Sequence, residues 1–294
     1  MLTIFLSLLA IIIMLLALAA LVLHYGYRAP RTLGTSSPED EGMNFKTLWL
    51  NTPKGKNLFA WFLPVNRQSP VIVILHGWGA SAGLMLPLAT PFYRRGYNVL
   101  LLDARNHGRS DADGHSSLPR FAEDLRVALA FLRTHPALHN GKLILMGHSV
   151  GAGAVLYEAS LRQDISAVIS LSAFAHPDWV MRRQLKLFPL PSCLISGILQ
   201  YIQWIIGVRF EGIAPMNTAC KVSCPVLLVH GKNDKTVPVS DARAILQNCK
   251  RAKLELLLIE GAGHNAIDKI EQHAHELFTF LDKADAMPGS IALK

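Results

Sequence analysis

A serine stands between two glycines at residues 147–151, which read Gly-His-Ser-Val-Gly. The apolar run 143–146 comes directly before this segment, and an alanine-rich stretch follows it. Small residues on both sides of the serine let the chain turn sharply from a strand into a helix and push the Ser149 hydroxyl out of the sheet. The pattern therefore predicts a serine nucleophile for acyl transfer, provided that a base and an acid lie within reach.

Two further residues are of the types that a nucleophilic serine needs. His264 lies in a Gly-Ala-Gly-His-Asn loop after the last predicted strand, where an imidazole could take the serine proton. Asp234 follows another predicted strand and is the favoured carboxylate for fixing the tautomer of that histidine. Asp178 also follows a strand and is the second candidate. We therefore predict Ser149, Asp234 and His264 as the catalytic residues.

An oxyanion intermediate needs main-chain N–H donors that already point at it. The segment His-Gly-Trp-Gly at 76–79 ends a predicted strand, and its glycines allow the loop to fold close to Ser149. The expected donors are the N–H groups of Trp78 and of Val150, which begins a predicted helix. An ordinary glycine-rich turn is the alternative interpretation of 76–79.

The elements that would position these residues alternate along the chain. Apolar runs predict strands at 46–50, 58–63, 71–75, 99–102, 143–146, 167–171, 226–229 and 254–259. Helical patterns lie between most of them, at about 84–95, 120–134, 150–161, 240–249 and 267–282. The alternation predicts an α/β fold with a mainly parallel sheet and helices on both faces. The candidate residues then follow the carboxyl ends of strands, where open sheets bind ligands.

One connection, between the sixth and seventh predicted strands, is too long for an ordinary crossover. Its apolar part, at about 174–219, contains the large aromatic residues Trp179, Phe188 and Trp204. A second membrane span is the alternative, but polar residues interrupt the apolar run, and a span here would separate the two halves of the sheet. We expect a helical cap, or lid, over the site.

The amino-terminal segment has no charged residue from Leu2 to Leu23. At roughly 1.5 Å per residue such a run is long enough to cross the hydrocarbon core of a bilayer. Residues 1–27 are therefore expected to form a single-pass transmembrane anchor, with a cleaved signal peptide as the alternative. Arg28 and Arg31 follow the run, so the positive-inside rule leans toward a cytoplasmic catalytic domain.

The composition limits the classes of function. The chain has 294 residues, of which 51% are hydrophobic and 17% charged, enough for one large domain. We expect that domain at 46–282, after a polar tether at 28–45 and before a tail at 283–294. The net charge is +8, but the Lys and Arg residues are scattered, so no nucleic-acid partner is expected. No zinc spacing occurs, and we expect unpaired thiols at Cys193, Cys220, Cys224 and Cys249.

Taken together, the motifs resemble the α/β-hydrolase superfamily over about residues 45–281. The similar segments are His-Gly-Trp-Gly at 76–79, Asp-Ala-Arg-Asn-His-Gly-Arg-Ser at 103–110, Gly-His-Ser-Val-Gly at 147–151, His-Gly-Lys-Asn-Asp at 230–234 and Gly-Ala-Gly-His at 261–264. The order serine, aspartate, histidine is also that of the superfamily. The resemblance implies an eight-stranded, mainly parallel sheet with a cap after the sixth strand, and no metal or organic cofactor. The most similar members are membrane-anchored lipase-like and serine-aminopeptidase-like hydrolases.

The segment 103–110 departs from the superfamily pattern at Asn106, where glycine is usual. Asparagine tolerates a positive φ better than most residues, so we expect the turn to be kept. The resemblance implies that this loop is architectural. Asp103 and His107 are therefore not expected to take part in catalysis.

The leading hypothesis is a membrane-anchored serine hydrolase that cleaves a carboxylic ester, of a lipid or another acyl group, through an acyl-enzyme at Ser149. Amide or peptide cleavage, as in an aminopeptidase, and thioester cleavage stay open, because the same residues can perform all three. The alternative from another class is a non-catalytic, membrane-tethered binding module with the same fold. The expected partners are a small-molecule or lipid ester and, through the anchor, a membrane. The oligomeric state is not indicated.

Overall fold

The computed structural model describes residues 3–7, 10, 14, 29–135, 142–249 and 253–286. Within them, one sheet of eight strands has the order β1-β2-β4-β3-β5-β6-β7-β8. The strands are β1 (Lys46–Asn51), β2 (Asn57–Leu63), β3 (Val71–Leu75), β4 (Asn98–Leu102), β5 (Leu143–His148), β6 (Ala167–Leu171), β7 (Val226–Gly231) and β8 (Leu254–Ile259). Strand β2 pairs antiparallel with β1 and β4, and the remaining pairs are parallel. The mostly parallel α/β-hydrolase sheet is confirmed.

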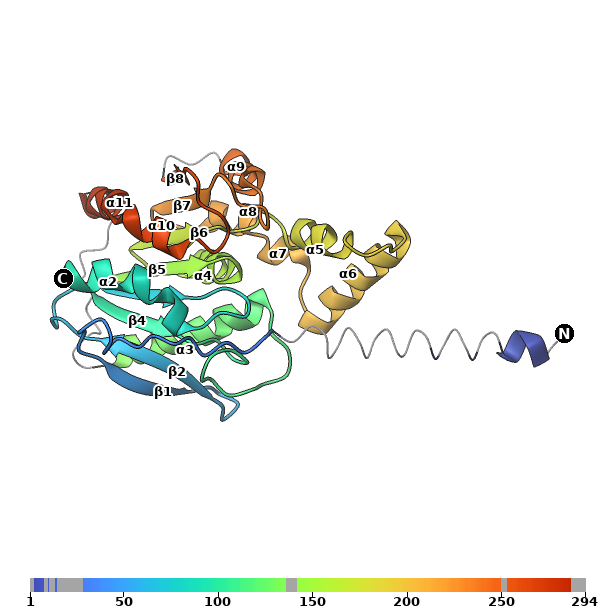
Figure 1. Cartoon of the computed structure of the whole chain (residues 1–294), viewed down its shortest axis with the longest axis horizontal. Coiled ribbons are helices and arrows are strands. Elements are labelled where there is room, and N and C mark those ends of the chain that lie inside the picture. Colours follow the sequence, from blue (N-terminus) through green and yellow to red (C-terminus); the bar gives the residue numbers. More distant parts are fainter. Residues whose placement is uncertain are drawn as a thin grey trace.

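Helices cover both faces of this sheet (Figure 1). They are η1 (Ala82–Met85), α2 (Leu86–Arg94), α3 (Leu118–Thr134), α4 (Val150–Ser160), α5 (Pro177–Leu185), α6 (Ser192–Ile206), α7 (Phe210–Ile213), α8 (Pro215–Thr218), η2 (Ala219–Lys221), α9 (Val239–Asn248), α10 (Ile267–Gln272) and α11 (Ala274–Ala286). Helices α3, α4 and α9 pack in one buried cluster, and α2, α10 and α11 pack in the other.

The central parallel strands are mainly apolar because both of their faces are buried. In β3, Val71, Val73 and Leu75 belong to one core cluster, while Ile72 and Ile74 belong to the other. A strand with water on one face would show alternating polar residues instead. The same double burial explains the apolar run 99–102 in β4 and the apolar run 143–146 in β5.

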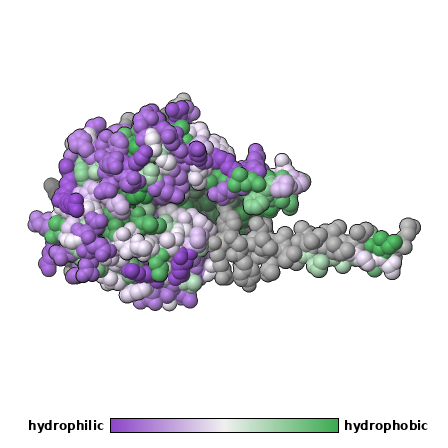
Figure 2. All heavy atoms as spheres, in the orientation of Figure 1, coloured by the Kyte–Doolittle hydropathy of each residue, from purple (hydrophilic) through white to green (hydrophobic). Residues whose placement is uncertain are grey.

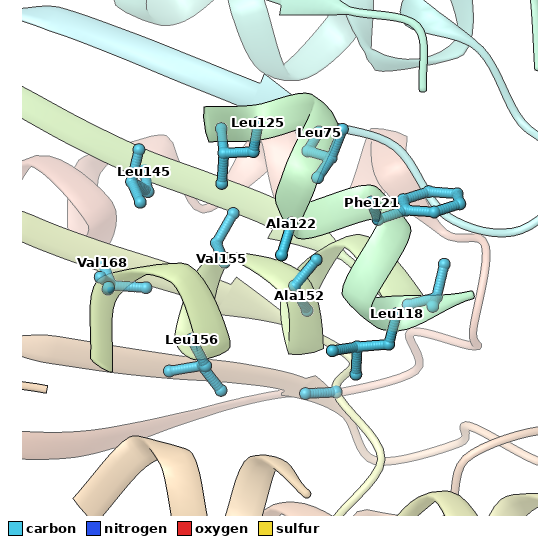
Figure 3. Close-up of a cluster of buried hydrophobic side chains, with 14 of the residues drawn as sticks. Leu75, Leu118, Phe121, Ala122, Leu125, Leu145, Ala152, Val155, Leu156 and Val168 are labelled. Carbon is cyan, nitrogen blue, oxygen red and sulfur yellow. The ribbon is translucent and has the colours of Figure 1, made fainter. Parts of the chain in front are cut away.

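The core beside the site is formed mainly by α3 and α4 packed over the central strands (Figure 3). Small residues allow the two helices to approach closely. A side chain at Gly153 in α4 would place its Cβ only 2.7 Å from the Leu118 Cδ1 of α3. The first turn of α3 is therefore held against the first turns of α4, next to the residues that follow β5.

Between β6 and β7 the chain forms the short helices α5 to α8 and η2, which we call the cap (residues 172–225). Helices α5 and α6 project beyond the sheet (Figure 1). The buried carboxylate of Asp241 in α9 ties α5 to the core, since it accepts hydrogen bonds from the Ala175 N–H and from both terminal nitrogens of Arg183. Apolar side chains also gather on the outer surface of the cap, where Trp204 is 77% exposed (Figure 2).

The predicted transmembrane anchor at residues 1–27 is corrected here. Throughout the described ranges, no helix is both long enough and apolar enough to cross a membrane. Of this segment the structure describes only residues 3–7, 10 and 14, and the rest of the predicted anchor lies outside the described residues. The membrane partner, the membrane location and the cytoplasmic orientation rested on that anchor and are corrected with it.

A second span within the cap is also ruled out by length. Helix α6 has 15 residues, which at 1.5 Å per residue span roughly 22 Å, against a hydrocarbon core of about 30 Å. The inner side of α6 is covered by the protein, where Ile195 and Leu199 are buried. Within the described residues, the apolar insertion therefore consists of helices that pack on the core and holds no membrane span.

The prediction of four unpaired thiols is wrong for two of them. Cys220 in η2 and Cys249 at the end of α9 form a disulfide that joins residues 29 positions apart. Cys224 is a buried free thiol and Cys193 an exposed one. The bond fastens the last turn of the cap to α9.

Candidate active site

Ser149 lies in the turn between β5 and α4 with a φ of 54° and a ψ of −115°. A non-glycine residue rarely adopts this conformation, and tight packing around the turn enforces it. A Cβ on Gly147 would lie 2.3 Å from the Gly151 carbonyl oxygen, and a Cβ on Gly151 would lie 2.3 Å from the His76 carbonyl oxygen. Both glycines of the motif are therefore needed sterically, as is typical of a nucleophile elbow.

The structure brings the three predicted catalytic side chains into one hydrogen-bonded chain. The Nε2 atom of His264 lies 3.0 Å from the Ser149 Oγ, and its Nδ1 lies 2.7 Å from the Asp234 Oδ2. A carboxylate only accepts hydrogen bonds, so the proton of the neutral imidazole sits on Nδ1. Nε2 is then free to accept the serine proton. This is the arrangement that a general base for Ser149 requires.

Asp234 is 6% exposed, and both of its carboxylate oxygens accept hydrogen bonds. Its Oδ1 accepts the N–H groups of Thr236 and Val237 at 2.9 and 2.8 Å. Burial alone would raise the pKa of Asp234, but the hydrogen bonds from His264 and from the Val237 N–H outweigh it and hold the pKa below its usual value. The carboxylate therefore stays charged at neutral pH.

The second candidate acid, Asp178, lies elsewhere. Its carboxylate accepts a hydrogen bond from Arg182 Nε at 2.7 Å, four residues along the cap helix α5. It therefore links side chains within the cap and does not contact His264.

The two predicted oxyanion donors flank Ser149. Val150 begins α4, so its N–H has no partner within the helix. Trp78 lies on the loop that follows β3. This loop passes close to the turn at Ser149, as shown by the 3.1 Å that would separate a Cβ on Gly77 from the Ser149 Cβ. Trp78, Ser149 and Val150 line one cavity. The two N–H groups as oxyanion donors stay a prediction.

The loop at 103–110 has the architectural contacts that the resemblance implies. Asp103 is buried and accepts the N–H groups of Ala82 and Arg109 at 2.6 and 2.8 Å. His107 is buried among rings, with its Nδ1 2.9 Å from the Arg105 carbonyl. Asn106 has a φ of 65°, so the expected tolerance of positive φ at this position is confirmed.

A cavity of about 550 Å³ opens over Ser149 between the core and the cap. Most of its cap wall is apolar and comes from α5, α6 and α7, with Val180, Met181, Ile202, Ile205, Phe210 and Ile213. The polar lining groups of the cap are Gln184 and Tyr201. Among the described residues that line the cavity, none carries a carboxylate. The site can thus accommodate an apolar group beside the serine.

Three polar residues that hold the site together cannot be identified from the sequence pattern. His148 occupies the variable position of the serine motif, and its Nε2 lies 2.7 Å from the His264 carbonyl oxygen. His230 is the last residue but one of β7, and its Nε2 lies 2.8 Å from the Val237 carbonyl oxygen, in the loop that carries Asp234. Asp241 joins the cap to α9. The available signal is a polar residue at the end of an apolar strand for His148 and His230 and an acidic residue in the first turn of a helix for Asp241, and neither signal specifies a partner.

Comparisons with known proteins show which family the fold belongs to. The family model described as serine aminopeptidase, S33, matches residues 66–215. Polyketide transferase af380 of Aspergillus fumigatus is 32% identical over 140 residues, 47% of this chain and 48% of the relative. The alpha/beta hydrolase domain-containing protein 17C of Xenopus tropicalis is 28% identical over 233 residues, 78% of this chain and 67% of the relative. The chain thus spans about half the length of the polyketide transferase.

Solved structures give the same fold. The Pyrococcus furiosus esterase Pf2001 superposes with a TM-score of 0.72 over 87% of this chain and 97% of the esterase, at 23% identity. The alpha/beta hydrolase GrgF from a Penicillium species superposes with a TM-score of 0.65 over 83% of this chain and 100% of GrgF, at 18% identity. At these identities the likeness shows the α/β-hydrolase fold.

Proposed function

Because the chain belongs to the serine aminopeptidase S33 family of the α/β-hydrolases, and is therefore a hydrolase, we propose that it cleaves carboxylic esters of apolar acyl groups. The single observation that supports this most directly is the hydrogen-bonded chain of Ser149, His264 and Asp234 on the wall of an apolar cavity. A serine in hydrogen-bond contact with a correctly oriented imidazole is an activated nucleophile.

The reaction proceeds in two acyl-transfer steps. The Ser149 Oγ attacks the ester carbonyl while His264 Nε2 takes the hydroxyl proton, and the N–H groups of Trp78 and Val150 stabilise the oxyanion. His264 then donates that proton to the departing alcohol, which leaves the acyl group on Ser149. A water molecule repeats the attack with His264 as base and releases the acid. Asp234 orients the imidazole and stabilises its charged form in both steps.

The lining of the cavity favours an ester with an apolar acyl chain over a peptide with a free amino terminus. An α-ammonium group that is taken out of water needs a carboxylate partner, because an unpaired buried charge costs several kcal/mol. The described residues that line the cavity offer none. The aliphatic cap wall instead favours burial of methylene groups, at about 0.8 kcal/mol each.

Labelling with a fluorophosphonate probe tests the nucleophile, and a substrate panel tests the class. The panel contains p-nitrophenyl butyrate and octanoate, a monoacylglycerol, an acyl thioester and leucine p-nitroanilide. We expect the wild-type protein to be labelled and to prefer the esters, and Ser149→Ala to show neither labelling nor turnover. Labelling with a preference for the anilide would assign an aminopeptidase, and a preference for the thioester would assign a thioesterase. An unlabelled wild-type protein would assign a binding module, and any of these three results overturns the proposal.

A further inference from the structure

His148, the residue before the nucleophile, makes a contact that its place in the serine motif does not explain. Its side chain is 4% exposed, and its Nε2 lies 2.7 Å from the main-chain carbonyl oxygen of His264. A carbonyl oxygen only accepts hydrogen bonds, so Nε2 carries the proton and donates it. Burial lowers the pKa of His148 to about 4, so the ring is neutral at pH 7.

The other side of the His148 ring faces the loop that carries Trp78. A Cβ on Gly77 would lie 3.0 Å from the His148 Nδ1, so this ring and the main chain of Gly77 are in close contact. The His148 and His264 rings also lie next to each other, with centroids 5.1 Å apart. One side chain is thus packed between the loop of the base and the loop of the predicted oxyanion donor.

The base itself has little regular structure to hold it. His264 lies in the loop between β8 and α10, with Gly261 and Gly263 just before it. The main-chain bonds of this loop include Asn233 N–H to the Ala262 carbonyl at 3.0 Å and the longer Ala266 N–H to the Gly263 carbonyl at 3.4 Å. The His148 bond is different in kind, because it acts on the peptide group of the base residue itself.

We propose that His148 is a positioning residue, whose Nε2–H fixes the main chain of His264 and thereby keeps the imidazole in register with the Ser149 hydroxyl. For its effect on turnover this inference rests on the proposed esterase function. The reaction rate depends steeply on the placement of the reacting groups, since a misplacement of about 1 Å lowers the rate on the order of 100-fold. A hydrogen bond outside the reacting atoms can therefore control kcat without touching substrate.

A matched pair of variants separates the hydrogen bond from the volume of the side chain. His148→Gln keeps an N–H donor close to the place of Nε2, whereas His148→Met has a similar shape and no donor. With p-nitrophenyl butyrate we expect kcat of the Gln variant within about threefold of wild type. We expect a loss of about 10- to 100-fold in the Met variant, with KM changed less than about twofold in both. The fluorophosphonate labelling rate should fall in parallel with kcat.

Hydrogen–deuterium exchange of peptides covering residues 260–267 gives a readout that does not depend on catalysis. Exchange should accelerate in the Met variant and stay at the wild-type rate in the Gln variant. Equal kcat and equal exchange in the two variants would overturn the inference. Turnover by Ser149→Ala would instead refute the proposed function, while the exchange comparison would still judge the role of His148. If the Met variant does not fold, His148→Asn, whose amide is too short to reach the carbonyl, takes its place.

Discussion

Replacing Asp234 with asparagine tests the proton arrangement of the site at almost unchanged shape. The Oδ1 of Asp234 accepts two main-chain N–H groups, from Thr236 and Val237. An asparagine must put its carbonyl oxygen at that place, because its NH₂ group would face two donors there. The NH₂ group then occupies the place of Oδ2, which lies 2.7 Å from the His264 Nδ1.

An NH₂ group at that place donates to Nδ1, so Nδ1 must become the acceptor and the ring proton must move to Nε2. Nε2 then faces Ser149 with a hydrogen and cannot take the hydroxyl proton. A wrong imidazole tautomer of this kind lowers kcat by about 10⁴-fold, or roughly 5.4 kcal/mol of transition-state free energy. We expect that loss for Asp234→Asn, with KM for p-nitrophenyl butyrate changed little because the cavity wall stays intact.

The assay is steady-state hydrolysis together with the rate of fluorophosphonate labelling, both at pH 7. Asp178→Asn is the control, because Asp178 bonds to Arg182 within the cap and should leave kcat within about twofold. Circular dichroism and the melting temperature establish that both variants are folded. An Asp234→Asn enzyme that keeps more than about a tenth of the wild-type kcat would refute the assigned role of the carboxylate.

Three further predictions concern the cavity, the disulfide and acid stability. Ile202→Trp should lower the ratio of kcat/KM for the octanoate ester to kcat/KM for the butyrate ester by about 15-fold. This value assumes that the indole displaces two methylene groups of the acyl chain, at about 0.8 kcal/mol each. Trp204→Ala, which changes the exposed side of the same helix, should leave the ratio unchanged. Reducing the Cys220–Cys249 bond should lower the free energy of unfolding in urea by about 3–4 kcal/mol for a loop of this length, and an unchanged midpoint with dithiothreitol would contradict this. The melting temperature should fall as the pH is lowered from about 6.5 to 4. Over this interval the histidines of the unfolded chain bind protons, whereas three buried histidine rings of the folded protein stay neutral until about pH 4. A constant melting temperature over the same interval would contradict this prediction. The histidines concerned are His76, His107 and His148.

The sheet could be predicted because its signal is local. A buried parallel strand must be apolar at every position, and β3 is, from Val71 to Leu75. The glycine at 147 could be interpreted for a similar reason, since a Cβ there would meet the Gly151 carbonyl oxygen four residues further on, whereas a Cβ on Gly151 would meet the His76 carbonyl oxygen just after the neighbouring strand β3. Periodicity and turn chemistry therefore suffice for the strands and for the elbow.

Contacts between distant loops could not be predicted in the same way. The bond from His148 to the His264 carbonyl joins positions 116 residues apart, and any residue supplies a carbonyl, so no side-chain type marks the partner. The Cys220–Cys249 bond likewise depends on how α8, which precedes η2, packs against α9. The predicted anchor failed for a different reason. Hydropathy reports only how apolar a segment is. A membrane span also requires a long helix, and no helix among the described residues is both long enough and apolar enough.

The difference between the core loops and the cap bears on substrate choice. Ser149, Asp234 and His264 lie on loops of the core, which many hydrolases share in this form, and they can serve esters, thioesters or amides alike. The apolar wall that faces them comes from the cap, and the cap is held by the bidentate pair of Arg183 with the buried Asp241. Under the proposed function, chemistry and selectivity would thus be carried by separate parts of the chain. A change in α6 should alter which acyl group is accepted while leaving the rate of serine labelling by a small probe unchanged.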